Sequence, residues 1–185
     1  YKAVKNYNTT IENNTYIIQN SNGLWGALTV GDMLSSVLPF EYDFIGLMDD
    51  TNEDGSLKAD KFIVSKDSKW YLVNNENSAI TGYIDDPIVE YTDKYVFSRN
   101  NEYVRIYSYE NTEYLSNFKI KDYILEDKYV GIVTNNFLLI YDDLGTSYLK
   151  SITLTNVTGK ITLEKVDNIL YVKANDTVLE SIALS

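Results

Sequence analysis

Asp60-Lys61-Phe62-Ile63-Val64 is the clearest copy of a short pattern that decides the fold. An Asp or Asn, which favours turns, precedes a run of aromatic and β-branched residues, which favour strands. The same pattern recurs in Asn14-Thr15-Tyr16-Ile17-Ile18, Asp93-Lys94-Tyr95-Val96-Phe97, Asp127-Lys128-Tyr129-Val130-Gly131 and Asp167-Asn168-Ile169-Leu170-Tyr171. Each copy is followed by a turn and a second apolar run. The copies begin about 33 to 46 residues apart, which is typical of propellers and related arrays.

The remaining sequence also favours strands. Short apolar runs recur about every ten residues, with Asn, Asp, Gly and Ser between them. We therefore predict a single all-β repeat domain over residues 1–185, built of antiparallel β-hairpin repeats in a propeller-like arrangement. An irregular β-sandwich or meander is the alternative. Residues 2–7 are expected to pair with the last hairpin and close the ring, which would remove an exposed edge. A short helix is expected over 32–38, with Asp32 as its N-cap and Pro39 as its end.

Composition excludes several kinds of chemistry. The 185 residues contain no His and no Cys, so the commonest general base, thiolate ligands and disulfides are missing. We therefore predict that the domain is not an enzyme. Its formal net charge of −11 repels phosphate backbones and anionic lipid, which argues against nucleic-acid and membrane-surface partners. No run is long enough for a transmembrane helix, so no membrane insertion is expected.

A calcium site is predicted in the acidic stretch from Asp50 to Asp60. Short oxygen-bearing side chains alternate around a glycine that can adopt a positive φ, as in loops that wrap Ca²⁺. The candidate ligands are the side chains of Asp50, Asn52, Asp54 and Asp60 and the backbone carbonyl of Ser56. The alternative is a solvated acidic loop between two strands.

Two segments resemble known repeat families. Asn22-Gly23-Leu24-Trp25-Gly26-Ala27-Leu28, followed by Leu38-Pro39-Phe40-Glu41-Tyr42-Asp43-Phe44-Ile45, resembles a WG repeat, a unit that covers Gly23 to Ile45. The stretch from Asp50 to Val64 is similar to the calcium loop of FG-GAP and VCBS propeller repeats, although residues are inserted between Gly55 and Asp60. Both resemblances imply a β-hairpin repeat fold that is used for binding and carries no catalytic residues.

Other side chains leave two further functions open. Acidic residues at Glu41, Asp43, Asp85-Asp86 and Asp142-Asp143 suggest a carbohydrate-active domain, because glycosidases use two nearby carboxylates. The 17 tyrosines suggest carbohydrate binding, because aromatic faces contact sugar rings. A structural subunit of a fibre or phage-like particle is the other alternative. Our prediction is a non-catalytic binding or structural module of a secreted or cell-surface protein, with a protein or glycan partner and one loop stiffened by calcium.

Overall fold

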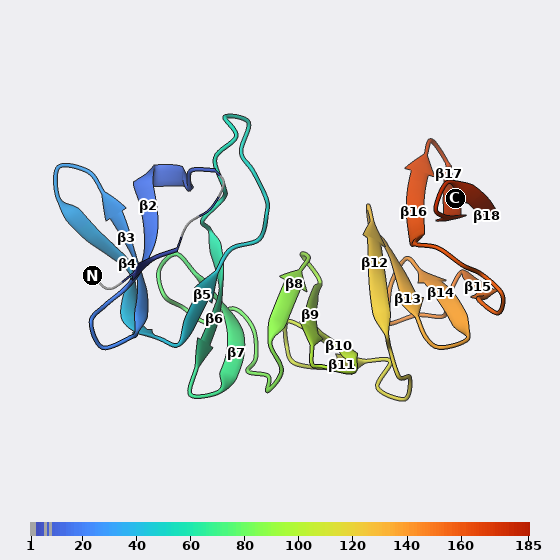
Figure 1. Cartoon of the computed structure of the whole chain (residues 1–185), viewed down its shortest axis with the longest axis horizontal. Helices are drawn as coiled ribbons and strands as arrows, with labels where there is room; N and C mark the ends of the chain where they lie inside the picture. Colours follow the sequence, from blue (N-terminus) through green and yellow to red (C-terminus); the bar gives the residue numbers. More distant parts are fainter. Residues whose placement is uncertain (1–2, 6, 8) are drawn as a thin grey trace. The chain divides into compact units, whose positions relative to one another are not determined.

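The computed structural model describes residues 3–5, 7 and 9–185, and in these residues the chain forms five small antiparallel sheets (Figure 1). A single turn of 3-10 helix, η1 (Glu12–Asn14), precedes β2. The first sheet has the order β1 (Ala3–Val4), β2 (Thr15–Gln19), β3 (Trp25–Val30), β4 (Leu34–Tyr42), and the second has β5 (Phe44–Gly46), β6 (Lys61–Lys66), β7 (Lys69–Asn74). The third has the order β11 (Glu113–Tyr114), β10 (Val104–Ser108), β9 (Tyr95–Arg99), β8 (Ile88–Tyr91). The fourth has β12 (Asp122–Glu126), β13 (Tyr129–Val133), β14 (Phe137–Tyr141), β15 (Lys150–Thr153), and the fifth has β16 (Ile161–Val166), β17 (Ile169–Ala174), β18 (Thr177–Ala183).

The five copies of the sequence pattern occupy equivalent positions in the five sheets. They fall on β2, β6, β9, β13 and β17, each of which is the second strand of its sheet in chain order. A second strand is an internal strand, hydrogen-bonded along both edges. In β6, β9 and β13 consecutive residues are buried, so both faces of these strands are covered and their residues are largely apolar. The all-β prediction is confirmed, and the repeat register read from the sequence matches the sheets.

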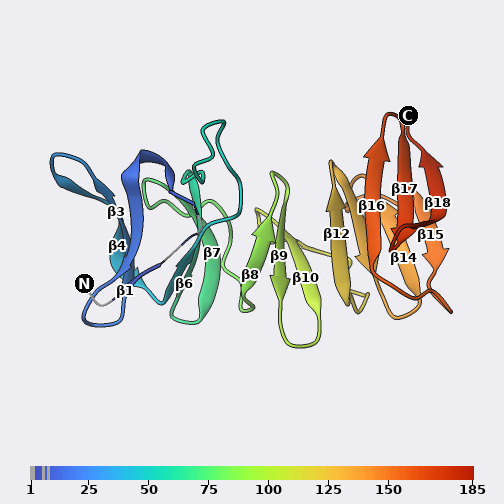
Figure 2. The same ribbon diagram turned by 45° about the horizontal axis from the view of Figure 1, so that its top comes forward.

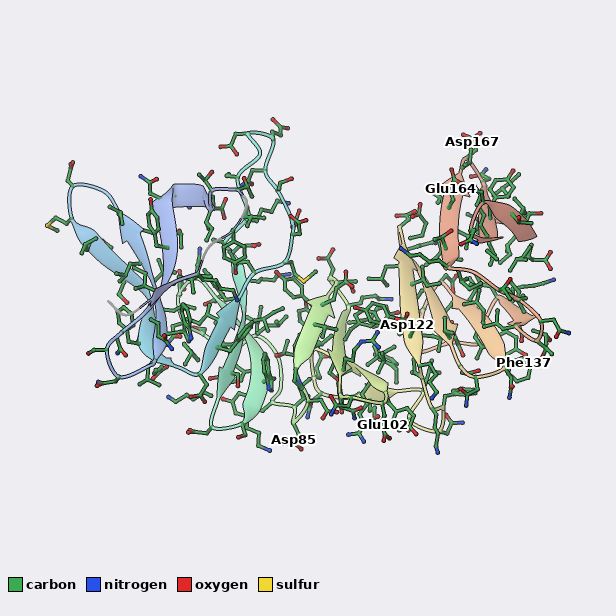
Figure 3. The ribbon with its side chains drawn as sticks, viewed as in Figure 1. Asp85, Glu102, Asp122, Phe137, Glu164 and Asp167 are labelled. Atoms are coloured by element: carbon green, nitrogen blue, oxygen red, sulfur yellow. The ribbon has the colours of Figure 1, made fainter. Side chains whose placement is uncertain are left out.

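Asp and Asn occupy the tight turns for a conformational reason. Asp67, Asp127, Asp167 and Asn175 lie between consecutive strands and have φ between 51° and 54°. Among residues with a side chain, Asn and Asp tolerate this left-handed region best. Such residues suit the two-residue turns whose twist matches that of a β-hairpin. Figure 3 shows Asp167 at the turn between β16 and β17.

Two expectations about local structure are wrong. Residues 32–38 do not form a helix, because Leu34, Ser35 and Ser36 pair with β3 as part of β4. Pairing across the β3–β4 hairpin outweighs the weak helix signal, which consisted of an N-cap residue at Asp32 and a helix-ending residue at Pro39. The expected pairing of residues 2–7 with the last hairpin is also wrong where the structure describes it, because β1 pairs with β2. Lys2 and Asn6 lie outside the described residues.

The chain divides into two compact units with separate cores. One unit contains residues 1–99 and 107–112, and the other contains 100–106 and 113–185. Phe62, Ile17 and Leu38 are fully buried in the core of the first unit, and Leu138, Ile140 and Leu170 are fully buried in the second. In both units the strands of a sheet follow one another in a meander (Figure 2). Cooperative unfolding of residues 1–185 as one domain stays a prediction.

The predicted WG-like unit contains a close backbone approach at Gly26. A Cβ at this position would lie 2.9 Å from Cδ1 of Phe40 and 3.0 Å from the backbone oxygen of Leu38. Both distances are far below ordinary carbon contacts, so only glycine fits without movement. The neighbouring Trp25 pairs with Gln19 and is partly buried against the first core. Membership of the WG family stays a prediction.

Candidate functional site

The predicted calcium ligands lie in the long connection between β5 and β6, which projects beyond the ends of these strands (Figure 1). The tip is a tight turn. Asn52 donates its backbone N–H to the oxygen of Ser56 at 2.8 Å, and Gly55 donates to the oxygen of Asn52 at 3.0 Å. Gly55 has a φ of 86°, which glycine adopts without strain. The turn therefore forms from the chain's own hydrogen bonds.

Side chains tie this turn to the preceding 3-10 helix. One carboxylate oxygen of Asp54 accepts from the backbone N–H of Ser56 at 2.9 Å and from its hydroxyl at 2.6 Å. These hydrogen bonds lower the pKa of Asp54. Glu12 accepts from the side-chain amide of Asn52 at 2.8 Å and from the backbone N–H of Ala59 at 2.7 Å. Glu12 thus connects both ends of the loop to a segment 40 or more residues earlier.

Asp50 and Asp60 have different surroundings from the turn residues. Both line a hollow of about 490 Å³, together with Tyr91 and Asp93. This volume lies within the range of small-molecule and side-chain pockets. Asp50 forms an ion pair with Lys58 at 3.3 Å. Because four aspartates and two lysines line it, the hollow carries net negative charge.

Tyr91 gives this hollow an aromatic wall, and the ammonium group of Lys61 lies near both this ring and that of Tyr109. The Nζ atom of Lys61 lies 5.6 Å from the ring centroid of Tyr91 and 5.8 Å from that of Tyr109. These distances are within the range of cation–π attraction. The Tyr109 hydroxyl donates to the backbone oxygen of Thr92 at 2.5 Å, which fixes the ring. We call the hollow and its tyrosine wall the acidic pocket.

Burial and nearby carboxylates disfavour ionisation of both tyrosines. Burial, with smaller contributions from Asp93 and Asp60, raises the pKa of Tyr109 to about 12. Burial, with Asp60 as the largest charged contributor, also raises the pKa of Tyr91. Since a phenolate here would face carboxylates in a partly desolvated site, the surroundings of the two rings suit a cation and reject an anion.

We expect the raised pKa of Tyr109 to make the free energy of unfolding depend on pH in the alkaline range. Above the ordinary tyrosine pKa of about 10 the unfolded chain loses the proton that the folded Tyr109 retains. The free energy of unfolding should therefore be constant below that pH and fall as pH rises towards about 12. Urea unfolding of the wild type and of Tyr109→Phe across this range measures the effect, and the variant should lose less stability. Identical pH profiles would contradict the assigned environment.

The five predicted calcium ligands are divided between two places. Asn52, Asp54 and Ser56 hydrogen-bond within the turn, whereas Asp50 and Asp60 line the acidic pocket. In the part of the chain that the structure describes, no group of three or more carboxylates is arranged to hold a metal ion. Ca²⁺ takes six to eight oxygen ligands. Calcium binding by this loop stays a prediction.

Four of the carboxylates considered for catalysis have structural partners. Glu41 pairs with Lys66 at 2.9 Å, Asp85 pairs with Lys69, Asp43 accepts from the backbone N–H of Asp67 at 3.1 Å, and Asp143 accepts from that of Gly145 at 2.9 Å. Carboxylates held in this way stabilise turns and strand ends.

Tyr91, Asp93 and Tyr109 were not predicted as site residues. The sequence contains one relevant signal, the alternation of tyrosines along the segments that become β8 to β10. That alternation shows which side chains share a face of a strand. It does not show that this face meets Lys61 at the start of β6. That contact joins residues about thirty or more positions apart in the chain.

Comparisons with known proteins identify a fold but no family. No family model matches the chain, and no curated protein matches its sequence. Among solved structures, Hsv2 of Kluyveromyces lactis is similar over 97% of this chain and 63% of its own, with a TM-score of 0.50 and 6% identity. KlHsv2 with loop 6CD replaced by a Gly-Ser linker is similar over 97% of this chain and 66% of its own, with a TM-score of 0.50 and 7% identity. Both are propeller-type domains, and at 6% and 7% identity the likeness is one of fold alone.

The chain spans 63% to 66% of the length of these two structures. A computationally designed protein, Ika8, is also similar, with a TM-score of 0.48, 11% identity, and coverage of 98% of this chain and 57% of that one. In the described residues, no helix of this chain has the length and apolar character needed to cross a membrane.

Proposed function

We propose that this chain is a non-catalytic binding module of a secreted or cell-surface protein, with its five sheets arranged as in a propeller. The observation that carries the proposal is the array of antiparallel sheets with one strand pattern in equivalent positions, together with its likeness to propeller-type domains. In such a scaffold rigid sheets position loops, and loops present the contact residues. Local ion pairs and hydrogen bonds of Glu41, Asp85 and Asp143 support binding over catalysis.

We place the partner-binding surface at the acidic pocket. Asp60 and Asp93 supply negative charge there, and Tyr91 supplies an aromatic face. The Lys61 ammonium group beside the Tyr91 ring is an example of a cation held against this aromatic face. A protein partner that presents a basic segment matches both the local charge and the net charge of −11. Opposite charge across an interface speeds association and selects partners.

Titration calorimetry with a short lysine-rich peptide tests this proposal. The wild type should bind the peptide with an affinity that weakens as salt is added. Asp60→Asn combined with Asp93→Asn should weaken binding by about tenfold, which corresponds to about 1.4 kcal/mol. Asp67→Asn combined with Asp167→Asn is the matched control, because it removes the same charge at turn positions where Asn is equally tolerated. Equal weakening by both pairs would contradict a specific pocket.

Calcium binding at Asp50 to Asp60 is proposed separately. Asp50, Asp54 and Asp60 would have to approach one another from their present surroundings, so binding would reorganise the loop. A cation that binds only the folded loop stabilises it by about 2.7 kcal/mol at a hundredfold excess over Kd. We expect millimolar Ca²⁺ to raise Tm relative to chelator, with a smaller effect of Mg²⁺. Asp54→Ala should abolish the difference. Equal Tm values in wild type would contradict the site.

A further inference from the structure

A second hollow, within the unit that contains residues 100–106 and 113–185, has the opposite character to the acidic pocket. It is organised by the antiparallel bridge between Val104 and Ile120, whose backbone N–H to O distance is 2.9 Å. Both of these residues are buried. Because side chains alternate along extended chains, the neighbours of a buried bridge pair point together to the other face. Those neighbours are Tyr103, Arg105, Lys119 and Lys121.

The tyrosine at the centre of this face holds two ammonium groups. The Nζ atoms of Lys119 and Lys121 lie 5.7 Å and 5.6 Å from the ring centroid of Tyr103. Cation–π attraction of this kind restricts long, flexible side chains, so less freedom is lost when a ligand binds them. Asp122 follows Lys121 at the start of β12 (Figure 3) and adds one carboxylate to this surface.

The face opens into a hollow of about 390 Å³ whose lining is mainly polar. Tyr103, Arg105 and Lys119 line it together with Tyr114 and Phe118. Phe118 is 40% exposed, so part of its ring remains available for contact. The volume of the hollow lies within the range of small-molecule pockets, and its lining combines aromatic and charged side chains.

The loop that completes the hollow has a strained backbone at Leu115, whose φ is 54°. Among the described residues with positive φ other than glycine, every other one is Asn, Asp or Ser. A branched apolar residue has no local hydrogen bond to offset the strain of this conformation. Strain of this kind clusters at functional sites, where surrounding structure holds it in place.

The local charge is opposite to that of the chain. The whole sequence has 16 basic and 27 acidic side chains. The lining of this hollow has Arg105 and Lys119 against one carboxylate, Glu113, and Lys121 lies beside it. An acidic protein that gathers cations at one hollow creates a local field for an anion, because opposite charges concentrate the ligand there.

We propose that this hollow binds a carboxylate-bearing sugar of an acidic polysaccharide. Arg105 and Lys119 would bind the carboxylate, and Phe118 and Tyr114 would contact the apolar face of the pyranose ring. Tyr103 is a positioning residue, since it acts through the two lysines. An acidic peptide could also pair with Arg105 and Lys119, but it has no sugar ring to contact the aromatic side chains. This inference is independent of the proposed basic partner, which concerns the other unit.

Calorimetry with a defined oligogalacturonate tests the proposal against two further probes. The wild type should bind the oligosaccharide, and its fully methyl-esterified form should bind at least about tenfold more weakly because the ring is kept and the charge is lost. A poly-glutamate peptide should also bind more weakly than the oligogalacturonate. Equal binding of the peptide would replace the sugar with an acidic protein as the ligand. Equal binding of the ester, or binding of none of the probes, would overturn the proposal.

Matched variants locate the site on the molecule. Arg105→Gln with Lys119→Gln should weaken oligogalacturonate binding by at least about tenfold. The control is Lys128→Gln with Lys160→Gln, which removes the same charge from other parts of this unit and should have less than about a twofold effect. Phe118→Ala should weaken the sugar but not poly-glutamate. Melting curves confirm that each variant is folded. Equal losses in the control pair would mean non-specific attraction and would overturn the site.

Discussion

Replacing Phe62 by Ala should lower the free energy of unfolding by about 3 to 5 kcal/mol, which is the range for truncating a buried aromatic residue. Phe62 is fully buried (0% exposed) on β6, among residues of the first core that include Ile17 and Val64. Its loss removes apolar contacts and leaves a cavity that two sheets would have to collapse to fill. Chemical unfolding followed by circular dichroism, which reports on both units, measures the change.

The control for this variant is Phe137→Ala. Phe137 is 44% exposed at the start of β14 (Figure 3), so the same truncation there should cost much less than that of Phe62. The same experiment tests whether residues 1–185 behave as one domain. A single transition that shifts as a whole in Phe62→Ala supports the prediction of one domain. Two transitions, of which one is unchanged, would contradict it, and a loss below about 1 kcal/mol would contradict the burial of Phe62.

Replacing Gly26 by Ala should cost about 1 to 3 kcal/mol, in the range for overpacking. The new Cβ would lie 3.0 Å from the backbone oxygen of Leu38 and 2.9 Å from the ring of Phe40. The ring can rotate away, but the backbone oxygen belongs to β4, and the strand would have to move. Thermal or urea unfolding measures the loss.

Gly31→Ala provides a matched control on the same hairpin. A Cβ at Gly31 would have no neighbour within 4 Å. The φ of Gly31 is not positive, so alanine is not strained there. This control should be neutral or slightly stabilising, because alanine restricts the unfolded chain. Equal effects of the two substitutions would mean that β3 and β4 do not approach closely at Gly26.

The internal strands could be predicted from sequence because their signal is local. The pattern around Phe62, for example, contains both the turn residue and the apolar run of a strand covered on both faces. Strands at sheet edges have weaker signals. β4 was mistaken in part for a helix because its start, Leu34-Ser35-Ser36, is exposed and has no clear alternation. Its conformation comes from pairing with β3, which lies outside any short window of sequence.

The candidate sites could be predicted only in part. The spacing from Asp50 to Asp60 correctly indicated a tight acidic turn at Gly55. It gave no sign that Glu12 would hold this turn, because that contact spans 40 residues. Asp60 immediately precedes β6, and its neighbours depend on where β8 and β9 lie. Long-range contacts of this kind are set by sheet packing, so they cannot be read from spacing along the chain.

The most direct test of the central claim, that the acidic pocket binds a basic partner segment, is an NMR titration of isotope-labelled protein with the lysine-rich peptide. We predict saturable amide shifts concentrated at residues 48–50, 58–61, 91–93 and 109, which are lost in Asp60→Asn with Asp93→Asn. Shifts spread evenly over the acidic surface, or no shifts at these residues at saturating peptide, would contradict the claim.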